Sequence, residues 1–164
     1  MKNGSLRSFT ELVAWQKCRV LRQAISKLSK ELPSEEKFRL TDQIIRSSRG
    51  PCANIAEGYG RYHENDNARF CRMAKGSLNE TKDHLTAAYD EEYISKEVLK
   101  QHWALAEEAL RVVNGYVNYL KRMGGPDQHL AEPPQPYGQE EDIFTEPPTD
   151  LEDGEADEDM GSTA

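Results

Sequence analysis

Apolar residues recur at spacings of three and four along four separate stretches of this chain, which is the period of one face of an α-helix. An apolar stripe of this kind must be buried against another element, so four stripes predict helices that pack on one another. No strand-like alternation competes with this pattern. We therefore expect an all-α protein, with the helices arranged as an antiparallel, up-down-up-down four-helix bundle.

Residues that start or stop helices flank each stretch. Ser8-Phe9-Thr10-Glu11 matches a capping box, so the first helix is expected to begin at Ser8 and to end before Pro33. Ser34 is the expected cap of the second helix, in which Gly50-Pro51 predicts a kink. Gly58 and Gly60 end that helix, the third runs from about 63–65 to 89, and Ser95 opens a fourth that ends at 124–126.

The stripes also predict which side chains are buried. Val13 and Phe38 fall on the stripes of the first and second helices, whereas Trp103 lies off the main stripe of the fourth. Gly76, inside the third helix, costs roughly 1 kcal/mol of helix propensity and so predicts a close approach between helices.

Composition changes sharply near residue 124. Through Met123 there are 21 Lys+Arg and 16 Asp+Glu, and beyond it there are no Lys or Arg and 13 Asp+Glu. Six of the eight prolines also lie in this last part, which has too few apolar residues to fold alone. We expect a flexible N-terminus at 1–7, a bundle at 8–123 and a disordered, acidic, proline-rich tail at 124–164.

Signatures of catalysis are missing from these patterns. No Glu stands three residues before a His, as a di-iron bundle requires, and no His/Cys spacing suits zinc. The three cysteines, Cys18, Cys52 and Cys71, have no CxxC spacing and are interpreted as reduced apolar residues. We expect no metal, no cofactor and no enzymatic activity. Without a signal peptide or a membrane span, a cytoplasmic location and no membrane partner are expected.

Arginines recur along the second and third helices. The set that we expect to contact nucleic acid is Arg46, Arg49, Arg61, Arg69 and Arg72. Guanidinium groups form bidentate, charge-assisted hydrogen bonds with phosphates, so this set could bind RNA or DNA. The alternative is a solvated face laced with ion pairs.

Asn54 and Glu57 place an amide and a carboxylate beside apolar residues near the end of the second helix. Buried polar groups need partners, and Glu57 could pair with Arg46 or Arg61. Such a structural polar network could set the register of the helices or line an interface between protomers.

The segment Glu140–Pro148 embeds Ile143 and Phe144 among acidic residues. It could be a docking motif for another protein, or it could fold back on the basic face and compete with phosphates. The third interpretation is that the tail serves only to keep the protein soluble.

Four sequence segments, read together, resemble a known family. They are Leu-Val-Ala-Trp-Gln-Lys at 12–17, Leu-Thr-Asp-Gln-Ile-Ile-Arg at 40–46, Asn-Ile-Ala-Glu-Gly-Tyr-Gly-Arg at 54–61 and Ala-Lys-Gly-Ser-Leu-Asn-Glu at 74–80. In this order they are similar to the bacterial four-helix bundle proteins named after 23S ribosomal RNA intervening sequences. The similarity covers roughly Phe9 to Met123.

The resemblance implies a ring-like homopentamer. It also implies relatedness to the accessory variability proteins of diversity-generating retroelements, which are basic pentamers that bind nucleic acid and a reverse transcriptase. Our first hypothesis is therefore a non-catalytic, oligomeric scaffold that binds nucleic acid through basic helix faces. The rival is a module that recruits another protein, such as a reverse transcriptase, through its bundle surface or its acidic tail.

Overall fold

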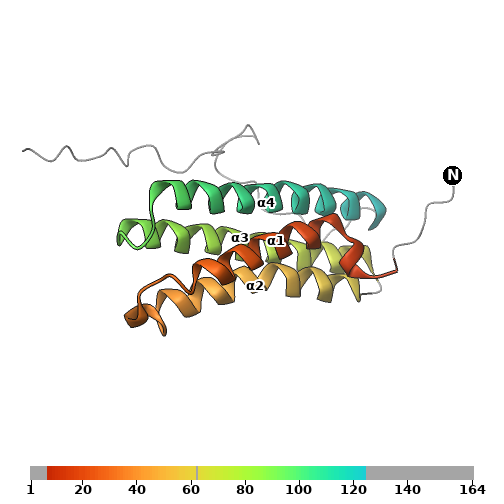
Figure 1. Cartoon of the computed structure of the whole chain (residues 1–164). Coiled ribbons are helices and arrows are strands. Elements are labelled where there is room, and N and C mark those ends of the chain that lie inside the picture. The colour runs from red at the N-terminus through yellow and green to blue at the C-terminus, as the bar shows by residue number, and fades with distance from the viewer. Residues whose placement is uncertain (1–6, 62, 125–164) are drawn as a thin grey trace, which may run out of the picture.

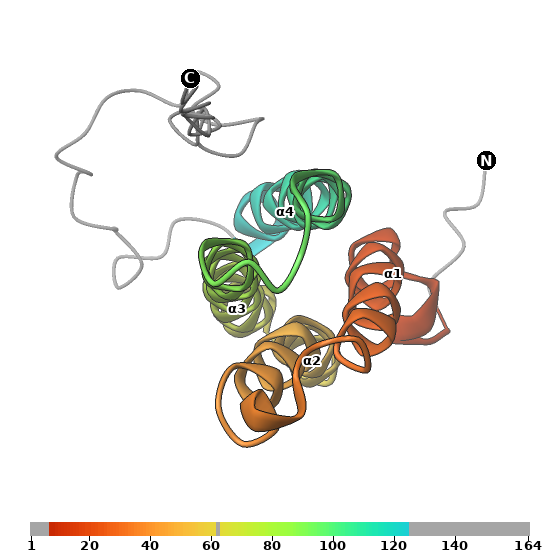
Figure 2. The same cartoon turned by 60° about the vertical axis from the view of Figure 1, so that its left-hand side comes forward.

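The computed structural model describes residues 7–61 and 63–124, and these form an antiparallel bundle of four helices (Figure 1). The elements are η1 Phe9–Glu11, α1 Val13–Leu28, η2 Ser34–Glu36, α2 Leu40–Tyr59, α3 Glu64–Asp90 and α4 Lys96–Gly124. Each helix packs against its neighbours in the chain, and α1 also packs against α4 to close the bundle (Figure 2). The expected fold class is confirmed, whereas the predicted tail, residues 124–164, lies outside the described residues apart from Gly124.

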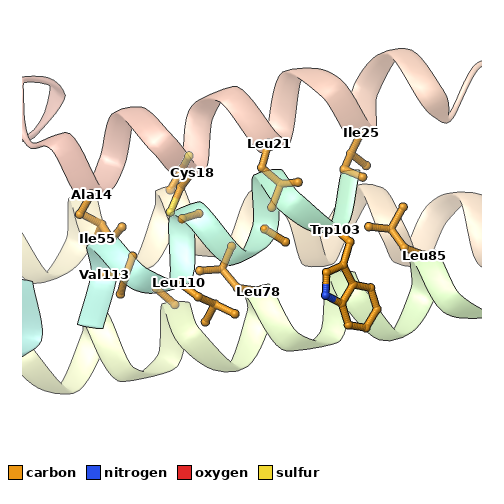
Figure 3. Packing of buried hydrophobic residues seen from close by; sticks show 14 of the residues in the cluster. Ala14, Cys18, Leu21, Ile25, Ile55, Leu78, Leu85, Trp103, Leu110 and Val113 are labelled. Carbon is orange, nitrogen blue, oxygen red and sulfur yellow. The ribbon is translucent and has the colours of Figure 1, made fainter. Parts of the chain in front are cut away.

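The apolar stripes meet in a single core that runs the length of the bundle. Leu21, Ile25, Leu78, Leu85 and Val113 come from α1, α3 and α4 and are fully buried (Figure 3). Burial of side chains of this size stabilises a fold by about 1.5–3 kcal/mol each. No helix in the described part of the chain is long and apolar enough to cross a membrane.

The first helix begins later than its sequence signal predicts. Ser8 caps only the short turn η1, where its hydroxyl accepts a hydrogen bond from the Thr10 N–H, and the Glu11 carboxylate accepts one from the Arg7 N–H. Leu12 is then extended, with φ −66° and ψ 123°, so α1 starts at Val13. This break buries Leu12 and turns Val13 outward, leaving it 55% exposed, so the predicted burial of Val13 is wrong.

The second helix also starts later, because Arg39 has a non-helical backbone with ψ −107°. Ser34 belongs to the separate turn η2, and the Leu40 N–H donates instead to the Glu36 carboxylate at 3.2 Å. Phe38 therefore lies in the connection and is 85% exposed, contrary to its predicted place in the core. From Leu40 to Tyr59 the helix continues through Gly50-Pro51.

The starts of α3 and α4 match their predictions, and Ser95 accepts a hydrogen bond from the Val98 N–H at 3.3 Å. Trp103 corrects the predicted stripe of α4, since it is only 8% exposed. Its ring lies under the Lys82 ammonium at 4.4 Å, and Lys82 forms an ion pair with Glu107. Trp103 thus fills the seam between α3 and α4.

The close approach predicted at Gly76 occurs instead at two glycines of α2. Nothing lies within 4 Å of the place where a Cβ on Gly76 would stand. A Cβ on Gly50 would stand 2.6 Å from Ser77 Oγ, and one on Gly58 would stand 2.6 Å from Asn67 Oδ1. The α2–α3 contact is therefore tight because α2 lacks side chains at these two points.

We expect Gly50→Ala to lower the free energy of unfolding by about 1–3 kcal/mol, because its methyl group would overlap Ser77. Gly76→Ala is the matched control and should raise it by about 0.5–1 kcal/mol, since the site is open and alanine favours a helix. Urea unfolding of both variants measures the difference. Equal stability of wild type and Gly50→Ala would contradict a tight α2–α3 seam.

Candidate functional site

A groove of about 600 Å³ runs between α1 and α2. Its apolar lining includes Phe9 of η1, Trp15 of α1, and Ile45, Cys52 and Ala56 of α2. Polar and cationic side chains complete it, namely Arg22, Gln23, Ser26, Ser48 and Arg49. Among its described lining residues there are two arginines and no carboxylate.

The aromatic wall of the groove is built by the break at Leu12. The Gln16 side-chain amide donates to the Thr10 carbonyl at 3.0 Å and so ties η1 back onto α1. This brings Phe9 edge-on to Trp15, with ring centroids 5.4 Å apart and planes at 67°. The Arg22 guanidinium, seven residues and so about two turns further along α1, lies over the Trp15 ring at 5.9 Å. Trp15 is half-buried, so part of its ring faces the groove.

The charge of α1 is one-sided. Val13–Leu28 contains Lys17, Arg19, Arg22 and Lys27 and no Asp or Glu. Lys17 is compensated by Glu108 of α4 at 2.6 Å, and this contact lowers the pKa of the Glu108 carboxyl. Within the described part of the chain, neither Arg22 nor Arg49 forms an ion pair. The groove therefore carries two uncompensated positive charges beside an aromatic ring.

The five arginines predicted to act together are distributed over several surfaces. Arg49 lines the α1–α2 groove, whereas Arg46 lines a smaller α2–α3 groove of about 350 Å³ and lies 3.7 Å from Asp42. Arg61, at the end of α2, lies over the Phe70 ring at 4.8 Å. Arg69 is exposed on α3, and Arg72 of the same helix is half-buried. Of the five, only Arg49 contributes to the α1–α2 groove.

Asn54 and Glu57, the predicted polar network, lie near the end of α2. Glu57 is exposed and pairs with Arg61, so this predicted pair is present but lies at the surface, and Asn54 is half-buried. Exposed pairs of this kind stabilise a protein by about 0–1 kcal/mol.

The buried polar contacts lie elsewhere, on α3. Asn67 donates to the Tyr116 hydroxyl at 3.1 Å and accepts from the Cys71 thiol at 3.5 Å. Thr81 Oγ1 lies 3.0 Å from Ser47 Oγ. Asn67, Cys71 and Thr81 are buried residues of α3, whereas Tyr116 and Ser47 reach them from α4 and α2.

Sequence reasoning missed Arg22, Trp15 and Phe9 as site residues. A usable signal was present, because a basic helix without any carboxylate is visible in the sequence of 13–28. The sequence did not show that Arg22 of α1 and Arg49 of α2 line the same groove, since this depends on how α2 is rotated toward α1.

The three cysteines are free and buried, as predicted. Burial raises the pKa of the Cys71 thiol to about 12, and burial likewise raises the pKa of Cys18 and Cys52 above the usual range. The nucleophilic form of cysteine is the thiolate, so these thiols are inert near neutral pH. Residues 7–61 and 63–124 contain no cluster of three or more His, Cys, Asp or Glu side chains that could hold a metal ion.

Comparisons with known proteins found a family and similar solved structures. The family model described as 23S rRNA-intervening sequence protein matches residues 10–115, more than half of the chain. A crystal structure from Bacteroides thetaiotaomicron VPI-5482, described as a protein with unknown function from the S23 ribosomal protein family, is similar, with 26% identity and a TM-score of 0.60. The match covers 64% of this chain and 98% of that chain. No curated protein matches significantly.

We expect the thiols to react with a disulfide reagent at about pH 8 only when the bundle opens, because the protein interior holds them protonated and covered. Labelling rates measured across a urea series should then follow the unfolded fraction. Cys52 is the sensitive position, since it lines the groove. Prompt labelling that disappears in Cys52→Ser would show that the floor of the groove is accessible to reagents.

Proposed function

This chain belongs to the 23S rRNA-intervening sequence protein family, and we propose that it is a non-catalytic, oligomeric binding protein whose α1–α2 groove takes single-stranded nucleic acid. The observation that carries this proposal is that one groove holds the half-buried ring of Trp15 together with Arg22 and Arg49, neither of which forms an ion pair among the described residues. The proposed binding surface lies between α1 and α2, whereas the arginines expected from the sequence lie along α2 and α3.

Each part of the groove suits one part of a nucleotide. Arg22 and Arg49 lie on the two helices that border the groove, so a backbone lying in it would meet a guanidinium from either side. Guanidinium groups bind phosphate oxygens in a fork, which strengthens and orients the contact. Trp15, with Phe9 at its edge, offers a surface on which a base can stack, and stacking of this kind contributes about 1–3 kcal/mol per base.

A single strand fits this chemistry better than a duplex. Stacking on Trp15 requires an unpaired base, because the faces of paired bases are covered by their neighbours. A groove with two cations and one stacking position gives little sequence discrimination, since every base has an aromatic face. The proposed ligand class is thus single-stranded RNA or DNA of mixed sequence.

The non-catalytic part of the proposal is supported by the state of the nucleophiles. The cysteine thiols are buried and protonated, and the groove is lined by no carboxylate or histidine among its described residues. Proton transfer to or from a bound ligand requires a side chain with a suitable pKa within hydrogen-bond reach. The groove is therefore suited to holding a strand rather than to cleaving one.

Oligomerisation is supported by exposed apolar side chains on α1 and α4. Six large hydrophobic residues are exposed in the described part of the chain, and four of them, Val13, Val20, Tyr119 and Met123, lie on these two helices. Because α1 and α4 pack against each other, these residues lie on adjoining elements. Contact through them would bring several grooves into one assembly, and multivalency raises the affinity for a long strand.

A protein partner is the alternative ligand, and the apolar part of the groove favours it. Phe9, Ile45 and Ala56 could accommodate a partner's apolar side chain between the two arginines. A reverse transcriptase, as in the related retroelement systems that the sequence resemblance suggests, is one such partner. Binding driven by apolar contact would resist salt, whereas phosphate binding would weaken steeply with it.

Fluorescence anisotropy with labelled single-stranded RNA should separate these alternatives. We expect the affinity of the full chain to fall between about 50 and 200 mM salt, because phosphate contacts release counterions. Arg22→Ala combined with Arg49→Ala should weaken binding about tenfold or more and reduce the salt slope by about 1.4, at about 0.7 per single-strand contact.

Arg69→Ala combined with Arg111→Ala is the matched control, since it removes the same charge from exposed positions outside the groove. Equal losses in both double variants would show that net charge, not the groove, determines binding. No binding at about 50 mM salt would reject the nucleic-acid function and leave protein recruitment.

We expect the protein to sediment as a multiple of its 18.6 kDa chain mass, and Tyr119→Glu to shift it toward the monomer. A carboxylate at an apolar contact is costly because it must be desolvated. Asn118→Glu is the control, because it adds the same charge at the neighbouring exposed position of α4. A monomeric wild type in analytical ultracentrifugation would contradict the oligomeric part of the proposal.

A further inference from the structure

We infer that the α1–α2 groove is also the docking site for a segment of this chain's own C-terminal region, Glu140–Phe144. This inference concerns the regulation of the proposed nucleic-acid site. Only the effect of docking on nucleic-acid binding rests on the proposed function. The contact itself needs no nucleic acid.

The groove presents two kinds of surface to an occupant. Phe9, Ile45 and Ala56 are apolar, whereas Arg22 and Arg49 are cationic and form no ion pair within the described residues. A complementary peptide must therefore place one or two large apolar side chains next to carboxylates. An apolar peptide would leave the arginines unpaired, and a purely acidic one would leave the apolar surface in water.

The part of the chain that follows the bundle, residues 125–164, contains one segment of this composition. Residues 125–164 hold 13 Asp+Glu and no Lys or Arg, and within them Ile143-Phe144 is the one pair of adjacent large apolar residues. Glu140, Glu141 and Asp142 precede this pair directly, so the carboxylates and the apolar pair come together in five residues. The charge of the segment is opposite to that of the groove, and its apolar content matches the groove's lining.

The connection from the bundle is long enough for docking within one chain. A Cβ on Gly124, at the end of α4, would overlap the Asn65 side chain, so α4 ends beside the start of α3. In Figure 1 the end of α4 and the start of α1 lie at the same end of the bundle, where Phe9 and Trp15 form one end of the groove. Ile143 follows Gly124 by 19 residues, which span up to about 63 Å when extended. A four-helix bundle is about 20 Å across, from helix spacings of 8–10 Å and a helix diameter near 10 Å.

Tethering makes a modest contact sufficient. An intramolecular ligand acts at an effective concentration that reaches the millimolar range, so a segment of weak intrinsic affinity still occupies its site. In the docked state the carboxylates of Glu140–Asp142 pair with Arg22 and Arg49, which are the groups proposed to hold phosphates. The segment and nucleic acid therefore compete for the groove. The segment raises the concentration of single-stranded nucleic acid that is needed to occupy it.

The test is binding of a labelled peptide, residues 138–148, to full chains in the absence of nucleic acid. One protein is wild type, one carries Ile143→Ala and Phe144→Ala, and a control carries Leu151→Ala and Met160→Ala in the same acidic region. We expect the peptide to bind the Ile143/Phe144 variant at least about tenfold more tightly than wild type or control, because only that variant leaves the groove open. Adding Arg22→Ala and Arg49→Ala to that variant should abolish the gain, whereas Arg69→Ala should not.

Three results would overturn the inference. The peptide could fail to bind the Ile143/Phe144 variant, it could bind all three proteins equally, or its binding could be unaffected by the two groove arginines. A difference between wild type and variant that grows with protein concentration would assign the docking to a second copy and contradict docking within one chain. Because no nucleic acid is present, these outcomes are independent of the anisotropy experiment, and either proposal can fail alone.

Discussion

The close contact between α2 and α3 determines the geometry on which the rest of the structure depends. Gly50 and Gly58 leave no room for a side chain on the α3 side of α2, and Thr81 joins Ser47 across the same seam. This contact fixes the rotation of α2 about its own axis. With one side of α2 against α3, Ile45, Arg49 and Cys52 are turned toward α1, where they form one wall of the groove. The packing of α2 against α3 thus places Arg49 in the groove between α1 and α2, which Arg22 also lines.

Periodicity predicted the four helices well because burial of a stripe requires a spacing of three and four whatever the neighbours are. The errors at Val13 and Phe38 have a different origin. Capping residues indicate where a helix can begin, but Ser8 caps a single turn and Ser34 lies within another. The extended Leu12 and the non-helical Arg39 then delay α1 and α2. Tertiary burial of Leu12 accompanies the first start and is not a local property of the sequence. The second start is marked by a local contact, the hydrogen bond from the Leu40 N–H to the Glu36 carboxylate.

The candidate site was less predictable than the fold for a geometric reason. Residues three apart on a helix lie about 60° from one another, so Arg46 and Arg49 share a broad face of α2 but open onto grooves on opposite sides of it. The sequence pattern assigns both arginines to one face of α2. In the structure, the packing of α1 and α3 on either side of α2 places them in different grooves. Similarly, Gly76 and Gly50 are both glycines within helices, and only the packing of α3 against α2 distinguishes the open position from the tight one.

The walls of the groove differ in local stability, because one of them includes the short turn η1. None of Phe9–Glu11 is buried, and η1 is attached to α1 by the Gln16 amide and the Phe9–Trp15 ring contact. Segments with few buried contacts open at a small fraction of the global unfolding free energy. Amide hydrogens of η1 should thus exchange with solvent far sooner than those of α1 or α2. The groove therefore combines a rigid floor with an aromatic edge that can move aside, and its width can adapt to what enters while the bundle stays folded.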